Sequence, residues 1–380
     1  MLSLPPLSLY IHLPWCERKC PYCDFNSHEA RDIPEQAYVE ALLLDLEGEI
    51  PRLQGREIQT LFIGGGTPSL FSATAIGQLM AGIAARVPLA RDLEATMEAN
   101  PGSAEAEKFA GFRAAGINRL SLGIQSFQDE QLQTLGRVHN SDQARRALAM
   151  VRDAGFDNFN IDLMHGLPGQ SVERGLADLA GALEFDPPHL SWYQLTIEPN
   201  TVFHKRPPVL PVEDTLADIQ DAGEALLQGN GLRAYEVSAW SKPGSECRHN
   251  LNYWSFGDYL AIGAGAHGKA THRDGRIERY AKRRQPADYL ASERGGFGAS
   301  QRWLEPEELP GEYMLNTLRL AGGAPLANFS RYTGLPPDAV QDTIDRLRER
   351  GLLQVSGSHL HCTATGWRYL DSVVAEFFPG

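Results

Sequence analysis

The chain has 380 residues, of which 42% are hydrophobic, and a net charge of −13. This length accommodates a barrel of about 250 residues with a smaller appended domain, and the composition predicts a packed globular protein rather than a disordered one. The acidic balance argues against nucleic-acid binding, which needs a basic surface. The start lacks a basic stretch before an apolar one, and no segment approaches the roughly 20 apolar residues of a membrane span, so we expect a cytoplasmic protein without a transmembrane segment.

Six short apolar segments, each followed by a helical pattern, predict six parallel strands joined by right-handed crossovers. Polar or glycine-rich residues follow almost every one of these strands. In a barrel the C-terminal ends of all strands meet at one mouth, so such residues would lie together. In an open doubly wound sheet only the strand ends at the switch point lie together. The sequence therefore favours an α/β barrel. The expected strands are 7–13, 60–63, 94–98, 119–124, 158–164 and 189–197, and the expected helices between them begin with 34–50, 75–86, 104–115 and 141–154.

The composition of the sequence changes after residue 199. A helix at 214–228 and a strand at 235–239 are expected, and the Arg-, Gly- and Ser-rich stretch 282–302 predicts a linker or exposed excursion. From residue 305 onward, helices at 313–320, 326–333 and 336–350, a two-stranded wing at 352–363 and a helix at 365–378 suggest a mainly helical, winged-helix-like domain. This segment contains six Arg and no Lys against ten Asp and Glu, so its net charge is negative. We therefore expect a packing or partner module rather than a DNA-binding one. The expected divisions are 1–240, 241–304 and 305–380.

Three of the five cysteines, Cys16, Cys20 and Cys23, lie in a C-x3-C-x2-C spacing directly after the first strand. A redox disulfide uses two thiols, and a closed zinc site needs four ligands. Three thiolates suit a cubane iron–sulfur cluster that leaves one iron open to a small molecule. The alternative is a zinc knuckle completed by His12 or His28.

A cluster with an open iron predicts S-adenosylmethionine as a cofactor, because its amino and carboxylate groups can chelate the iron beside its sulfonium. The glycines at 64–66 let the backbone approach a ligand closely, although a tight turn explains them equally well. Glu98 ends a strand, and Gln125 and Asp162 are polar residues within apolar strands, where burial requires a partner. Arg137 can bind a carboxylate, with a surface salt bridge as the alternative.

The stretch ECRHNLNYW, residues 246–254, offers groups that suit haem. His249 can ligate haem iron, Asn250 can orient it, and Tyr253 and Trp254 supply flat apolar surface. Cys247 is a second, less certain ligand. Simple packing of a histidine beside two aromatics is the alternative. His267 and Cys362 are expected to be structural.

The segments YIHLPWCERKCPYCDF, GGGTPS, MEANPG, GIQSF, GRVH and IDLMHGLPGQ, in this order and spacing, resemble the radical S-adenosylmethionine family and its oxygen-independent coproporphyrinogen III oxidase-like group. The resemblance covers nearly the whole chain and implies a partial (β/α)6 barrel. It implies that the three clustered cysteines hold a [4Fe–4S] cluster. The residues that match the family's S-adenosylmethionine contacts are Tyr10, Tyr22, Gly65, Gly66, Thr67, Glu98, Gln125, Arg137 and Asp162.

Three features differ from the decarboxylating oxidases of that group. Only nine residues precede Tyr10, Phe25 stands where those oxidases have another cysteine, and an H-N-x-x-Y-W motif is present. These features resemble the haem chaperone (HemW) branch, which implies haem, haem-requiring acceptor proteins and an electron donor for the cluster as partners. Pairing into a homodimer and cleavage of S-adenosylmethionine are left open. The rival hypothesis is an oxidative decarboxylase that makes protoporphyrinogen from coproporphyrinogen.

Overall fold

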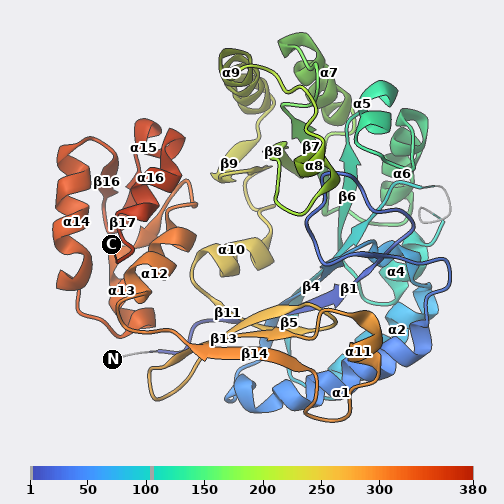
Figure 1. The fold of residues 1–380 in the computed structure, drawn as a ribbon, viewed down its shortest axis with the longest axis horizontal. Helices are drawn as coiled ribbons and strands as arrows, with labels where there is room; N and C mark the ends of the chain where they lie inside the picture. The colour runs from blue at the N-terminus through green and yellow to red at the C-terminus, as the bar shows by residue number, and fades with distance from the viewer. Residues whose placement is uncertain (1–2, 103–106, 380) are drawn as a thin grey trace.

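The computed structural model describes residues 3–102 and 107–379 (Figure 1). In these residues one sheet has the strand order β14-β13-β12-β11-β1-β4-β5-β6-β7-β8-β10-β9. Its centre is the six predicted parallel strands, which are confirmed with small differences at their ends. They curve around a shared interior as a partial barrel. The six strands are β1 (Leu7–Leu13), β4 (Ile58–Gly65), β5 (Leu89–Ala99), β6 (Arg119–Gln125), β7 (Phe159–His165) and β8 (His189–Gln194).

Helices cover the outer face of this barrel (Figure 1). Side-chain caps fix several of their starts: Asn140 and Gln143 form a capping box on α6, and Ser171 caps α7. Residues 104–106 of the helix expected at 104–115 lie outside the described residues. None of the described helices is long and apolar enough to cross a bilayer. The barrel helices are α1 (Glu35–Leu53), η1 (Pro68–Leu70), α2 (Ala73–Ala84), α4 (Phe109–Ala114), α5 (Asp129–Thr134), α6 (Ser141–Asp153), α7 (Val172–Leu183), α8 (Val202–Lys205) and α9 (Glu213–Gly229).

Strands that the sequence did not predict extend both edges of the barrel sheet. On one edge, β11 (Asp258–Ile262) pairs parallel to β1 and is followed by antiparallel β12 (His267–Thr271), β13 (Ile277–Lys282) and β14 (Gly298–Trp303). On the other, the single strand expected at 235–239 is wrong, because a turn divides it into β9 (Arg233–Glu236) and β10 (Ala239–Ser241). The stretch 282–302, expected to be a linker or exposed excursion, is not a linker, because it holds α11 (Pro286–Leu290) and most of β14, but the residues of β14 are largely exposed.

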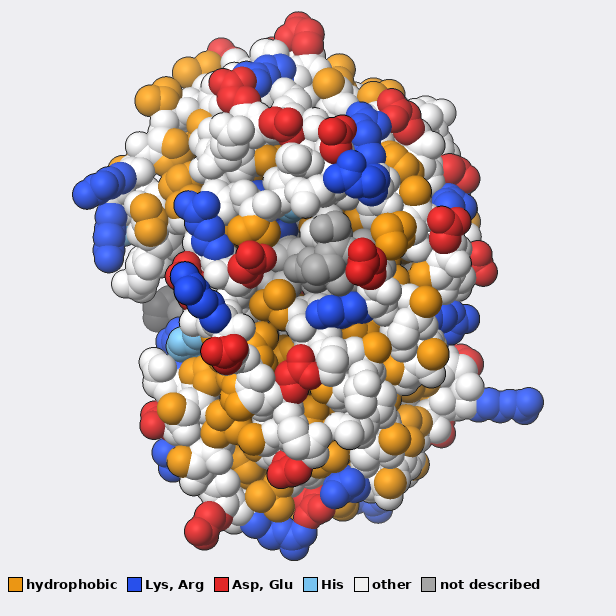
Figure 2. Space-filling view, turned by 90° about the vertical axis from the view of Figure 1, so that its right-hand side faces the viewer, with side chains coloured by type: hydrophobic (Ala, Val, Ile, Leu, Met, Phe, Trp, Pro, Cys, Tyr) orange, Lys and Arg blue, Asp and Glu red, His pale blue; other side chains and the backbone are white. Residues whose placement is uncertain are grey.

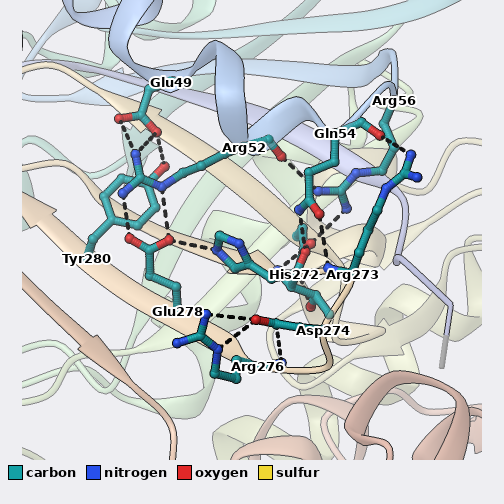
Figure 3. A network of polar contacts seen from close by, with 12 residues as sticks. Glu49, Arg52, Gln54, Arg56, His272, Arg273, Asp274, Arg276, Glu278 and Tyr280 are labelled. Atoms are coloured by element: carbon teal, nitrogen blue, oxygen red, sulfur yellow. Dashed lines mark hydrogen bonds and ion pairs between the residues drawn. The ribbon is translucent and has the colours of Figure 1, made fainter.

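Buried charges explain why hydropathy gave no strand at β13. The Lys282 Nζ lies 2.6 Å from both Asp45 Oδ1 and Glu49 Oε1 of α1. Arg52 of α1 pairs with Glu278 at 2.5 Å, in the network that Figure 3 shows between α1 and the added strands. The polar residues of β13 therefore point toward α1, where buried charges are stabilised in pairs.

The C-terminal segment forms a second apolar core, separate from that of the barrel, and the winged-helix-like expectation is confirmed there. Tyr313, Phe329, Leu347 and Val373 belong to this core. The final helix expected at 365–378 is divided at Tyr369. The elements are α12 (Leu309–Thr317), β15 (Ala324–Pro325), α13 (Leu326–Thr333), α14 (Asp338–Glu349), β16 (Leu353–Ser356), β17 (His359–Cys362), α15 (Ala364–Arg368) and α16 (Leu370–Ala375).

The helix α10 (Arg248–Trp254) lies between this domain and the barrel (Figure 1). Figure 2 shows basic and acidic side chains interspersed with apolar ones over the face that it draws, without a single basic field on that face.

Candidate cluster and cofactor site

The three clustered cysteines come from one loop at the C-terminal end of β1. Cys16 is buried on β2 (Trp15–Cys16), which pairs with β3 (His28–Glu29), while Cys20 and Cys23 are half-buried. The Cys23 amide donates to the Cys20 carbonyl at 3.1 Å, which turns the loop back on itself. Burial raises the pKa of both Cys16 and Cys23, and the neighbouring thiols raise it further. The three thiols therefore lie close enough to interact.

The donor set fits a cluster better than a zinc knuckle. Both ring nitrogens of His12 are engaged, Nδ1 with the Tyr10 hydroxyl and Nε2 with the Asn26 carbonyl, each at 2.9 Å. Among the described residues, no three His, Cys, Asp or Glu side chains are placed to share one metal ion. A cubane needs no such convergence, because each thiolate binds a different iron. The guanidinium of Arg137 also donates to the Cys20 Sγ at 3.6 Å, which suits an anionic sulfur.

The end of β4 forms a glycine cradle beside this loop. Gly65 has a φ of +123°, which favours glycine, and its amide donates to Glu98 Oε2 at 3.1 Å. A Cβ at Gly66 would lie 2.4 Å from the Trp15 carbonyl oxygen. The Thr67 amide donates to that same oxygen at 2.7 Å. The glycines are thus required for β4 to close against the cysteine loop, which supports the tight-turn explanation, and close approach of a ligand stays a prediction.

Two carboxylates share the barrel interior above this cradle. Burial, and then the charge of Asp162, raises the pKa of Glu98 to about 7. Burial also raises the pKa of Asp162, whose oxygens accept hydrogen bonds from Ser121 at 3.0 Å and Asn160 at 2.8 Å. Two half-buried carboxylates that repel each other suit a ligand that brings positive charge or hydroxyl donors.

Arg137 is directed inward rather than into a surface salt bridge. Its Nη2 donates to Asn100 Oδ1 at 2.6 Å and to the Gly123 carbonyl at 2.8 Å. Its Nε is fully enclosed and has no partner among the described residues. A buried guanidinium with a free donor suits an anionic group of a cofactor. Asn100, which sequence reasoning did not select, lies within the MEANPG motif that could have identified it.

The remaining predicted cofactor residues lie around the same mouth. Gln125 has a φ of +69° at the end of β6, and its Oε1 accepts a hydrogen bond from the Tyr193 hydroxyl at 2.9 Å. Tyr22 packs against Phe203 with ring centroids 6.4 Å apart. Tyr10 on β1 is half-buried, and burial raises its pKa. The structure therefore assembles the residues that the motifs placed far apart in the chain.

The helix α10, which carries the H-N-x-x-Y-W motif, is attached to the barrel by a residue that the sequence did not flag. The carboxylate of Glu94 on β5 accepts the amides of Arg248 at 3.1 Å and His249 at 3.0 Å, and the Cys247 thiol at 3.7 Å. It thereby caps the N-terminus of the helix. Burial raises the pKa of Cys247 to about 11, so that it stays a protonated thiol at neutral pH.

His249 is buried at the barrel wall as a neutral imidazole. Burial, and then the charge of Arg119, lowers its pKa to about 3. Its Nδ1 lies 2.9 Å from Thr60 Oγ1, whereas its Nε2 has no hydrogen-bond partner in the described part of the chain. Its ring centroid is 5.1 Å from that of Phe62, which also stacks on Tyr10 at 6.4 Å. Thr60 on β4, rather than the predicted Asn250, therefore orients the imidazole.

The two aromatic residues of the motif join α10 to its neighbours. Tyr253 packs on Tyr259 of β11, with centroids 4.8 Å apart, and the Arg319 guanidinium lies 4.3 Å from the Trp254 ring. The outer face of α10 also borders a pocket of about 730 Å³ between the barrel and α13. The residues predicted to bind haem do not line that pocket. Its walls include Leu4, Thr60, Arg248, Leu251, Arg331 and Tyr332, but not His249, Asn250, Tyr253 or Trp254.

The comparisons with known proteins agree with this geometry. Residues 10–180 match the Radical SAM superfamily and residues 304–369 match the HemN C-terminal domain. The fold matches the solved coproporphyrinogen III oxidase (HemN) of Escherichia coli with a TM-score of 0.83 over 98% of this chain and 90% of that one. At 23% identity this likeness concerns the fold alone. Fold and site together define a radical SAM protein, a class that implies a [4Fe–4S] cluster and S-adenosylmethionine.

Curated relatives specify the family further. The heme chaperone HemW of Escherichia coli is 50% identical over 99% of each chain, and that of Haemophilus influenzae is 48% identical over 99% of each chain. The Bacillus subtilis protein of the same name is 34% identical over 97% of this chain and 98% of its own. The chain therefore belongs to the HemW family of the radical SAM superfamily, and the expected family is confirmed.

Proposed function

We propose that this protein binds haem and delivers it to haem-requiring apoproteins. The observation that carries the proposal is the position of His249, whose Nδ1 is held by Thr60 and whose Nε2 has no partner among the described residues, while burial lowers its pKa to about 3. This is the form of histidine that coordinates iron, with the second nitrogen fixed by a hydrogen bond. The full-length relatives named heme chaperone HemW support the same activity.

We assign the [4Fe–4S] cluster to Cys16, Cys20 and Cys23. When bound, a cluster with one open iron supplies an electron to a cofactor sulfonium. Arg137 then faces the Cys20 sulfur and offers its free Nε to the cofactor carboxylate, while Glu98 accepts hydroxyl or amino donors. The residues assigned to S-adenosylmethionine are Tyr10, Tyr22, Gly65, Gly66, Thr67, Glu98, Gln125, Arg137 and Asp162.

We assign the haem iron to His249 Nε2, with Asn250, Tyr253 and Trp254 bordering the bound macrocycle. Cys247 is less suited to be an axial ligand, because its thiol is protonated and directed at Glu94. The proposed partners are an acceptor apoprotein and an electron donor for the cluster, and the proposed location is the cytoplasm.

The decisive experiment titrates the anaerobically reconstituted protein with haem. The wild-type protein is expected to bind haem stoichiometrically and transfer it to an apo-haem protein, followed by the haem absorption spectrum. His249→Ala is expected to weaken binding at least tenfold and alter that spectrum while the cluster absorption stays unchanged. His361→Ala, in the C-terminal wing, is the matched control.

The same preparation tests the rival activity. Incubation with coproporphyrinogen, a reductant and S-adenosylmethionine is expected to release no carbon dioxide. Formation of protoporphyrinogen would refute the haem chaperone assignment in favour of an oxidative decarboxylase. An unchanged haem spectrum and affinity in His249→Ala would place the iron ligand elsewhere.

A further inference from the structure

Arg119, the first residue of β6, is a buried cation without a partner. Its side chain is among the largest fully buried ones, with 2% of the residue exposed. Its side-chain Nε and Nη2 are fully enclosed and make no hydrogen bond in the described part of the chain. Burial lowers the pKa of the guanidinium, but the nearby Cys247, Glu94 and Asp162 raise it on balance, so the charged form is favoured. None of these groups contacts the two enclosed donors, which leaves them for a ligand.

A second unpartnered donor lies beside it. Thr96 of β5 is the register partner of Arg119, so both side chains leave neighbouring parallel strands on the same face. The Thr96 hydroxyl is also buried and has no partner among the described residues. Ser121, two residues along β6, bonds Asp162 and Asn160, which identifies this face as the polar interior of the barrel. Two donors without acceptors therefore point into the interior together.

The acidic residues around Arg119 are already engaged. Glu94 accepts the amides of Arg248 and His249 at the start of α10, and Asp162 accepts hydrogen bonds from Ser121 and Asn160. Neither carboxylate accepts a hydrogen bond from Nε or Nη2 of the guanidinium. The position is nevertheless near His249, because the imidazole packs on Phe62 of β4, which is the register partner of Thr96 on β5. The free donors and the imidazole thus face the same region of the interior.

The donor set specifies the chemistry of the ligand. A guanidinium presents parallel N–H groups that match a carboxylate, and a threonine hydroxyl adds a third donor. Haem carries two propionate carboxylates beside the iron that His249 is assigned to bind. We infer that Arg119, with Thr96, binds a propionate carboxylate of the haem while His249 holds the iron. This inference rests on the proposed function, and it assigns the polar end of the ligand to the barrel interior.

The test compares haem with haem dimethyl ester, in which both propionates are neutral, on the cluster-loaded protein. The wild-type protein is expected to bind haem at least tenfold more tightly than the ester, as a buried charge-assisted pair predicts. Arg119→Gln is expected to lose that preference by weakening haem binding alone, and Thr96→Val to reduce it several-fold. Arg331→Gln is the matched control, since Arg331 lines the pocket on the outer face of α10.

Each result decides the inference. Equal affinities of the wild-type protein for haem and ester refute it, and this comparison needs no variant to fold. A loss of haem preference in Arg331→Gln but not in Arg119→Gln also refutes it, and would place the propionates in the outer pocket. In both cases haem binding through His249 still stands. Absence of any haem binding by the wild-type protein refutes the proposed function and the inference with it.

Discussion

Replacing Glu98 with Gln should stabilise the protein at alkaline pH although it removes a residue that we assign to the cofactor site. The pKa of this carboxyl is raised to about 7 by burial and by Asp162, from an ordinary value of 4.5. At about 1.36 kcal/mol per pH unit, ionised Glu98 costs the folded state up to about 3 kcal/mol. The residue is half-buried, so solvent screening brings the expected cost to about 1–3 kcal/mol.

The sign follows from proton linkage. Between pH 4.5 and about 7 the folded protein retains the Glu98 proton that the unfolded chain has lost, so this group's contribution to stability falls as the pH rises through that window. The glutamine variant has no proton to lose. Its free energy of unfolding relative to that of the wild-type protein should therefore increase by about 1–3 kcal/mol between pH 5 and pH 8.

Urea unfolding of the cluster-free, cofactor-free protein at pH 5 and pH 8 measures this difference. Glu349→Gln, an exposed position on α14, is the control for loss of one negative charge, and its difference from wild type should not depend on pH. The reasoning is refuted if the difference in free energy of unfolding between Glu98→Gln and the wild-type protein is constant or becomes smaller toward pH 8. Weaker S-adenosylmethionine binding by Glu98→Gln, measured separately, tests its role in the site.

Three further outcomes are expected. Cys20→Ser should abolish the visible absorption of the cluster, whereas Cys362→Ser, in the C-terminal core, should leave it unchanged. Gly66→Ala should lower the free energy of unfolding by about 2 kcal/mol or more, because the new methyl group would lie 2.4 Å from a backbone carbonyl oxygen and force the backbone to shift. The same variant should bind S-adenosylmethionine more weakly in calorimetry. Lys282→Met should lower the free energy of unfolding by about 3–5 kcal/mol, because it leaves the buried Asp45 carboxylate without a cation, while Glu49 keeps only Arg52. Lys242→Met, at an exposed ion pair, should cost no more than about 1 kcal/mol in the same urea assay.

The barrel could be predicted because its strands are mainly apolar segments that alternate with helical patterns and are followed by glycine, proline or polar residues. Strands β12 and β13 could not, since each carries a buried charged residue. Lys269 on β12 is buried against Asp258 at 2.9 Å, and Lys282 on β13 is buried against Asp45. Hydropathy scores such residues as exposed, and only the tertiary pairing with β11 and α1 shows that they are not.

The candidate site divides in the same way. Glu98 and Gln125 were detectable because a polar residue at the end of an apolar strand stands out in the sequence. Thr60 and Arg119 lie within or at the start of strands and resemble ordinary strand residues. Their importance depends on two long-range events: the return of α10 to β4, which brings His249 to Thr60, and the register that places Arg119 beside Thr96.

The cysteine loop and the glycine cradle suit either haem delivery or porphyrin decarboxylation, so the choice rests on the other end of the interior. There, Glu94 fixes the start of α10 and Thr60 bonds Nδ1 of His249, whose Nε2 has no partner among the described residues. An imidazole of this kind can ligate iron, whereas coproporphyrinogen contains no iron for it to bind. The proposed haem binding therefore gives His249 a chemical use that decarboxylation would not.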